Sequence, residues 1–203
     1  MALTGIILVG FVIMHMVVNL QVFLGPDALN AYGEFLRHLL HGAGLWIARS
    51  ILLVSVVLHI WAAISLTRES KAAKPEGYKV QKWRESTYAS RTMMFSGPIL
   101  FLFIIYHLLH FTIGTVHPDF IAGDVYHNFT VGFRVGYVTA FYVVAMLALG
   151  LHMNHGIWSM LQTLGLSHPR WNIYRKMVSY GITTVVVAGN IVMPVAVFAG
   201  WIK

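Results

Sequence analysis

Five apolar runs constrain what this chain can fold into. As helices rising about 1.5 Å per residue, each is long enough to cross a hydrocarbon layer of roughly 30 Å. The chain is 58% hydrophobic and 10% charged, whereas soluble domains carry about 25% charged residues. The sequence therefore predicts one all-α integral membrane domain over residues 1–203, with five transmembrane helices. The predicted spans are approximately 2–24, 44–66, 94–116, 135–161 and 178–201.

Cysteine is absent, whereas histidine occurs 11 times. Without thiols there is no disulfide, thiolate-bound zinc, iron–sulfur cluster or covalently attached haem c. Any metal must therefore rely mainly on histidine. The net charge of +7 does not indicate nucleic-acid binding, because most basic residues lie in the connections between apolar runs.

Lysine and arginine favour one side of the predicted membrane. The connections after the second and fourth runs carry ten basic residues: Arg68, Lys71, Lys74, Lys79, Lys82, Arg84, Arg91, Arg170, Arg175 and Lys176. The opposite side has only Arg37 and Arg134, with Arg49 just inside the second run. The positive-inside rule thus predicts a cytoplasmic amino terminus and an external carboxyl terminus. Residues 69–87 form either a docking surface for a soluble partner or a solvated loop.

Six histidines lie inside the predicted spans, where a polar side chain is costly and marks a functional hypothesis. They are His15, His59, His107, His110, His152 and His155. A single such histidine is readily explained by a hydrogen bond to a neighbouring helix. Six of them across four spans indicate a shared role.

Depth separates four of these histidines into two layers. His15 and His107 each lie 13 residues from the expected cytoplasmic edges of their spans, roughly 20 Å along a helix. His59 and His152 lie 7 and 9 residues from theirs, roughly 10–14 Å. Two histidines at each depth on a four-helix bundle predict two stacked b-type haems, each held by two imidazoles.

His110 and His155 leave the ligand choice open, since each lies three residues after a proposed ligand on a neighbouring part of the same face. Either could replace its neighbour or bond a haem propionate. Four glycines in or near these spans would allow close approach of a macrocycle or another helix: Gly97, Gly114, Gly150 and Gly156.

The stretch Leu149-Gly-Leu-His-Met-Asn-His-Gly-Ile-Trp-Ser159 resembles the fourth-helix motif of succinate dehydrogenase and fumarate reductase cytochrome b subunits, in their five-helix, two-haem branch. The resemblance continues in Met1-Ala-Leu-Thr-Gly5, His15-Met-Val-Val-Asn19 and Ser90-Arg-Thr-Met93, and through Ser96-Gly97 to Tyr106-His107-Leu108. It covers nearly the whole chain.

This resemblance implies one haem ligand from each of the first four helices. Carried over by motif, these are His15, His59, His107 and His152, paired first with third and second with fourth. A fumarate reductase branch has an acidic residue two positions before the fourth-helix ligand. Here that position is Gly150, so a proton path through it is not implied.

The resemblance also implies partners and a reaction. A cytoplasmic flavoprotein subunit and an iron–sulfur subunit would oxidise succinate, and electrons would pass through the inner and outer haems to a quinone, preferably menaquinone. Bis-histidine ligation leaves no open iron position for oxygen chemistry. The direction of the reaction, the haem potentials and the oligomeric state are left open.

Quinone reduction consumes two protons and needs polar groups at the outer membrane edge. Glu34, His38 and His41 are the candidates, with Arg37 beside them as a partner for an outer haem propionate. An ordinary polar loop is the equal alternative. Asp119, Asp124 and His127 lie in the other outer connection, and Ser90 and Arg91 are candidates for an inner propionate.

Two other classes of protein compete with this interpretation. A two-haem gamma-type subunit of formate dehydrogenase or nitrate reductase would share the bundle and the haems but serve other partners. A non-redox transporter would bind no haem, and it gives unrelated histidines no reason to fall into two matched layers.

Overall fold

The computed structural model describes residues 1–73 and 87–202, which form helices and no strand. Five helical segments are long and apolar enough to cross a membrane, so the predicted all-α membrane fold is confirmed. They are Ala2–Leu24, Pro26–Ala73, Met93–Ile113, Gly136–Thr163 and Asn172–Phe198. The second extends beyond its predicted end at 66, because the polar residues that follow are good helix formers.

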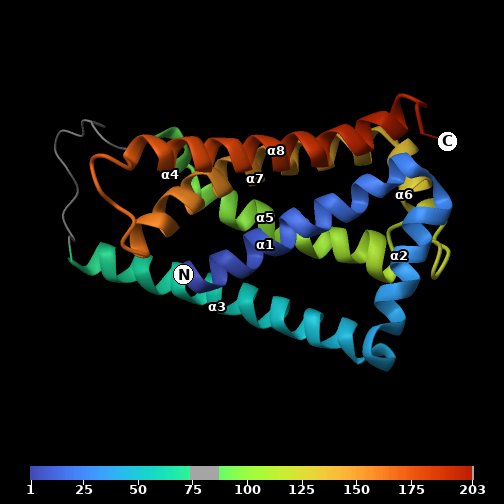
Figure 1. The fold of residues 1–203 in the computed structure, drawn as a ribbon, viewed down its shortest axis with the longest axis horizontal. Helices are drawn as coiled ribbons and strands as arrows, with labels where there is room; N and C mark the ends of the chain where they lie inside the picture. Colours follow the sequence, from blue (N-terminus) through green and yellow to red (C-terminus); the bar gives the residue numbers. More distant parts are fainter. Residues whose placement is uncertain (74–86, 203) are drawn as a thin grey trace.

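Along the chain, successive long helices run in opposite directions (Figure 1). They are α1 (Ala2–Asn19), α3 (Ala43–Ala73), α5 (Met93–Leu108), α7 (Gly136–Thr163) and α8 (Asn172–Phe198). Helices α7 and α8 pack along their length, and α1 contacts α3, α7 and α8. The amino terminus lies toward one end of the bundle and the carboxyl terminus at the other, as an odd number of spans requires.

Two short helices close the end of the bundle that holds the carboxyl terminus (Figure 1). Helix α2 (Pro26–His38) follows Gly25, whose φ of 98° favours glycine, and has proline in its first turn. Helix α6 (Val125–Arg134) is capped by Asp124, whose carboxylate accepts the His127 N–H at 2.9 Å and the Asn30 amide at 3.0 Å. These two hydrogen bonds lower the pKa of Asp124.

Helix α5 changes geometry where it reaches this end. Residues Leu109–Ile113 form a π-helical turn that stops at Gly114, whose φ is 86°. Turns of this kind occur often at functional sites, because the extra residue turns side chains to a new face. At the opposite end, the one-turn helix α4 (Tyr88–Arg91) packs against α7.

Packing within the bundle is uneven. Helices α6, α7 and α8 contribute most of the buried core, for example Phe133, Tyr142, Ile157 and Val197. Helix α3 instead buries only Ser55. A helix that merely faced lipid on one side would still bury its other face against the bundle. The α3 side of the bundle is therefore loosely packed within the described residues.

Candidate functional site: two histidine pairs in the bundle

The first pair, the α1–α5 pair, joins His15 and His107. Their ring centroids are 5.8 Å apart with planes almost perpendicular, at 87°. The His15 ring also stacks on Phe11, one helical turn earlier. The α1–α5 pair lies in the half of the bundle nearer α2 and α6.

The second pair, the α3–α7 pair, joins His59 and His152. Their ring centroids are 6.3 Å apart and their planes are tilted by 55°. The structure thus brings the first predicted span together with the third, and the second with the fourth. The described residues contain no group of three or more His, Asp or Glu side chains placed to hold a metal ion, so each pair offers two protein ligands.

Hydroxyl groups contact Nδ1 of both histidines in the α3–α7 pair. The Thr4 hydroxyl donates its one proton to the Met1 carbonyl at 2.9 Å and lies 3.1 Å from Nδ1 of His59. Because that proton is used, the hydroxyl oxygen accepts from Nδ1–H. His59 therefore keeps its lone pair on Nε2, the nitrogen left free to bind a metal.

His152 has the same arrangement from another helix. The Ser96 hydroxyl donates to the Met93 carbonyl at 3.3 Å and lies 3.2 Å from Nδ1 of His152. The hydroxyl oxygen then accepts from Nδ1–H, and Nε2 again carries the lone pair. With the hydroxyl protons on the carbonyls of their own helices, both rings of the α3–α7 pair are in the tautomer that a metal requires.

In the α1–α5 pair, a phenol takes the place of the aliphatic hydroxyl. The buried Tyr142 hydroxyl lies 3.3 Å from Nδ1 of His107 and 3.1 Å from Nδ1 of His110. His110 is completely buried, and its Nε2 has no hydrogen-bond partner among the described residues. The His15 side chain forms no hydrogen bond among the described residues.

The environment of His110 is made by residues near the end of the bundle. His117 donates from Nε2 to the Asn128 carbonyl at 2.8 Å and accepts the Asp119 N–H at Nδ1 at 3.1 Å. Its ring centroid lies 4.9 Å from that of His110. A Cβ atom on Gly132 would lie 2.9 Å from Cε1 of His110 and 3.0 Å from Nε2 of His117. Glycine is therefore required where α6 meets these two rings.

The four glycines singled out in the sequence have different surroundings. A Cβ on Gly150 would meet Val187 of α8 at 2.9 Å, so this glycine serves helix packing. Gly114 ends the π-helical turn with its positive φ. A Cβ on Gly97 or Gly156 would meet nothing within 4 Å, which leaves open space beside both positions.

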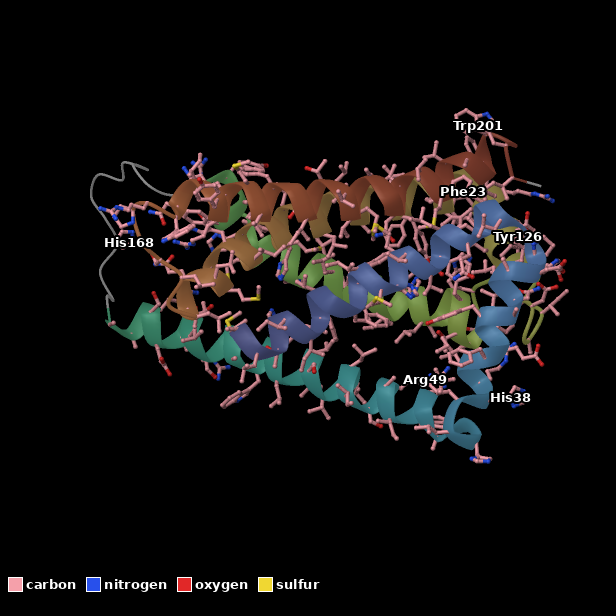
Figure 2. All side chains as sticks on the ribbon, in the orientation of Figure 1. Phe23, His38, Arg49, Tyr126, His168 and Trp201 are labelled. Carbon is pink, nitrogen blue, oxygen red and sulfur yellow. The ribbon has the colours of Figure 1, made fainter. Side chains whose placement is uncertain are left out.

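The predicted quinone residues occupy the α2 end of the molecule. Glu34 and His38 are exposed on α2, and His41 is exposed in the following turn with a φ of 56°. Figure 2 shows His38 at the end of α2. No hydrogen bond joins these three side chains within the described residues. Arg37 donates to the Gly123 carbonyl at 3.2 Å, which ties α2 to the segment before α6.

The remaining predicted site residues are placed as follows. Ser90 and Arg91 lie in α4, where the Ser90 hydroxyl donates to the Thr87 carbonyl at 2.8 Å. His127 lies 3.1 Å from a carboxylate oxygen of Asp119. His155 is half-buried on α7. The predicted docking segment 69–87 falls mostly on residues 74–86, outside the described residues.

An open pocket of about 400 Å³ lies at the same end of the bundle as α2. It is lined by Val22, Phe23, Gly25, Tyr126, Trp201 and Ile202. Three of these, Phe23, Tyr126 and Trp201, are seen together near the carboxyl terminus in Figure 2. None of the site residues predicted from the sequence lines this pocket.

Sequence reasoning did not assign roles to Thr4 or Tyr142, the hydroxyl partners of two paired histidines. Hydroxyl side chains in apolar helices commonly bond a carbonyl of their own helix. Their presence in a span therefore carries no signal of a contact with a distant histidine. Thr4 and Ser96 lie in stretches that carried the resemblance, although their contacts with His59 and His152 did not follow from it.

Five spanning helices and two histidine pairs define an integral membrane protein of the helical-bundle class. Residues 67–191, more than half of the chain, match the family model described as the succinate dehydrogenase/fumarate reductase transmembrane subunit. The chain belongs to this family, whose members are membrane subunits of multi-subunit dehydrogenase or reductase complexes. No match was found among curated proteins or among solved structures.

Proposed function

We propose that this chain is the membrane-anchor cytochrome b subunit of a succinate:quinone oxidoreductase, of the five-helix, two-haem branch. It resides in a bacterial cytoplasmic membrane with its amino terminus in the cytoplasm. A flavoprotein subunit carries out the dicarboxylate chemistry, and an iron–sulfur subunit delivers the electrons to this chain. A quinone, preferably menaquinone, receives them.

The pairing of the four histidines carries this proposal. Two imidazoles that bind one metal ion from opposite sides, through bonds of about 2 Å, have ring centroids roughly 6 Å apart. The observed separations of 5.8 Å and 6.3 Å fit that requirement. The hydroxyl contacts at Nδ1 of His59 and His152 leave Nε2 as the ligand atom. The residues present therefore fit two bis-histidine haems.

The packing supports the same assignment. A macrocycle needs flat space between helices, and α3 buries almost none of its residues against the bundle. Gly156 lies one turn after His152 on α7 with open space beside it, and Gly97 follows Ser96. When bound, b haems supply one-electron redox chemistry at two depths in the membrane, whereas the protein provides ligation and position.

The polar ends of the bundle have separate roles in the proposal. Glu34, His38 and His41 are exposed at the α2 end, so they are available to bind a quinone and exchange protons with water. Arg37 at that end, with Ser90 and Arg91 at the other, would bind haem propionates. Arg37 uses one N–H on the Gly123 carbonyl and keeps other donors.

The family description also includes fumarate reductases, which favours one second candidate: the di-haem anchor of a quinol:fumarate reductase or of another quinone-linked dehydrogenase. Gly150 separates these candidates from a branch that moves protons through an acidic residue at this position. Gly150 faces Val187 and Thr183 of α8. Because glycine has no side chain, the chain has no carboxylate at this position.

The test is the haem content of the complex purified in mild detergent with its partner subunits. A pyridine haemochrome assay with a reduced-minus-oxidised spectrum measures haem b per polypeptide. Two haems per chain are expected. A content of one haem per chain would show that one of the two histidine pairs does not bind haem. No haem from freshly prepared membranes would rule out the electron-transfer function.

A further inference from the structure

The hydroxyl group of Tyr142 in α7 contacts His107 of α5 and His110 of the π-helical turn that follows α5. The hydroxyl oxygen is 3.3 Å from Nδ1 of His107 and 3.1 Å from Nδ1 of His110. A phenol has one proton to donate and lone pairs to accept. Because a buried proton left without an acceptor is costly, the phenol is best satisfied when it donates to one of the two nitrogens and accepts an N–H from the other.

The two possible directions have opposite consequences for His107. If Tyr142 donates to His107, a neutral His107 carries its proton on Nε2 and has no lone pair for a metal. If Tyr142 donates to His110, it accepts Nδ1–H from His107, and the lone pair of His107 lies on Nε2. Only the second direction allows His107 to act as a ligand.

We propose that His110 is a positioning residue that fixes the metal-binding tautomer of His107 through the Tyr142 hydroxyl. This inference rests on the proposed function, because the direction of the hydrogen bond follows from ligation by His107. His110 accepts the Tyr142 proton at Nδ1 and carries its own proton on Nε2.

The surroundings of His110 oppose a role as a ligand. Its Nε2 is buried without a partner, and the nearest imidazole, His117, uses Nε2 on the Asn128 carbonyl and Nδ1 on the Asp119 N–H. His117 therefore offers no lone pair that could complete a second pair with His110. The fixed rings beside Gly132 instead hold His110 in one orientation.

The α3–α7 pair differs in how its tautomers are set. Thr4 and Ser96 use their protons on carbonyls of their own helices, at Met1 and Met93. No second histidine is involved there. In the α1–α5 pair alone a second histidine contacts the hydroxyl group, and this difference makes the inference testable within one molecule.

The experiment is a redox titration of the purified complex with its partner subunits, which resolves the reduction steps of the two haems. The variants are Tyr142→Phe, His110→Leu, His110→Asn and Ser96→Ala. Loss of the acceptor at Nδ1–H makes an imidazole a weaker electron donor to its metal. Tyr142→Phe and His110→Leu should each shift the same single step to a more positive potential or remove that haem alone. Ser96→Ala should shift the other step.

His110→Asn is the conservative variant, since its amide oxygen can accept the Tyr142 proton near the position of Nδ1. It should restore the wild-type step that His110→Leu shifts. The unshifted haem in each variant reports that the bundle is folded.

Three results would overturn the inference: both steps unchanged in Tyr142→Phe and His110→Leu, both steps shifted together, or His110→Asn equal to His110→Leu. All three presuppose two haems in the wild type, so they leave the proposed function standing. A wild-type complex without haem would overturn the proposed function and this inference together.

Discussion

Thr4 and His59 are joined by a hydrogen bond of 3.1 Å between the first turn of α1 and the middle of α3. The contact spans 55 positions in the chain, and α1 also packs against α3. With the Thr4 proton on the Met1 carbonyl, the bond runs from the His59 N–H to the Thr4 oxygen. The start of the chain thus orients a histidine of the second span.

Thr4→Val removes this acceptor and should weaken binding of the haem at the α3–α7 pair about 10–100-fold, the usual effect of losing a partner of a metal-bound histidine. The rate of haem transfer to an apo-globin acceptor measures the change. Thr4→Ser keeps the hydroxyl and should retain wild-type transfer. Equal transfer from Thr4→Val and the wild type would show that the hydrogen bond does not support ligation.

Single replacement of the four paired histidines by leucine should remove one haem each. His15→Leu and His107→Leu should lose the same haem, and His59→Leu and His152→Leu the other, as seen in the reduced-minus-oxidised spectrum. His155→Leu is the matched control, because His155 lies one turn from His152 on α7. Loss of a haem in His155→Leu with retention in His152→Leu would exchange their roles.

Gly132→Ala should destabilise the α2 end of the bundle by about 1–3 kcal/mol, the usual cost of overpacking. The added Cβ would come within 2.9–3.1 Å of the His110 and His117 rings, and these rings are held by hydrogen bonds. Thermal unfolding in detergent measures the loss. Gly10→Ala is the control, because a Cβ there meets nothing within 4 Å; similar losses in both variants would refute the steric explanation.

Asp124 should make the stability of α6 depend on pH in the acid range. Its pKa in the folded protein is lowered from the ordinary value of 3.8, first by the His127 N–H and then by the Asn30 amide. The stabilisation is therefore complete above pH 3.8 and is lost as the pH falls through the folded pKa.

Asp124→Ala should lower the free energy of unfolding by about 0.5–2 kcal/mol at neutral pH, as expected for loss of a helix N-cap. The difference from the wild type should shrink in acid, measured by thermal unfolding from about pH 7 down to about pH 2, a range that extends below the ordinary pKa of the carboxyl group. Asp124→Asn keeps a capping oxygen and should lose less stability and show no such pH dependence. A constant difference at all pH values would mean that the carboxylate charge is irrelevant.

The proposed orientation can be tested with single cysteines, because the chain has none of its own. Ser70, near the end of α3, and Ala122, just before α6, are both exposed. The end of α3 and helix α6 lie at opposite ends of the bundle (Figure 1). In intact spheroplasts, a membrane-impermeant thiol reagent should label Ala122→Cys and leave Ser70→Cys unlabelled until the membrane is opened. The reverse pattern would invert the predicted topology.

The sequence by itself determined the five spans and the depths of the paired histidines. Apolar helices of this length with few charged residues are stable in lipid. The fixed rise of an α-helix converts the position of a residue in such a run into its depth in the membrane. His15 and His107, and likewise His59 and His152, could therefore be matched before any contact was known. The motif around His152 added the resemblance to the family of succinate dehydrogenase and fumarate reductase membrane subunits.

Only the tertiary structure decided which groups meet the paired histidines. Depth says nothing of how far each helix is rotated about its axis, and that rotation directs Thr4 toward His59 and Tyr142 toward both His107 and His110. Side-chain hydrogen bonds act over about 3 Å, so contacts between helices depend on packing that no single span encodes. The tautomer of each imidazole, and with it the capacity to bind a metal, follows from those contacts.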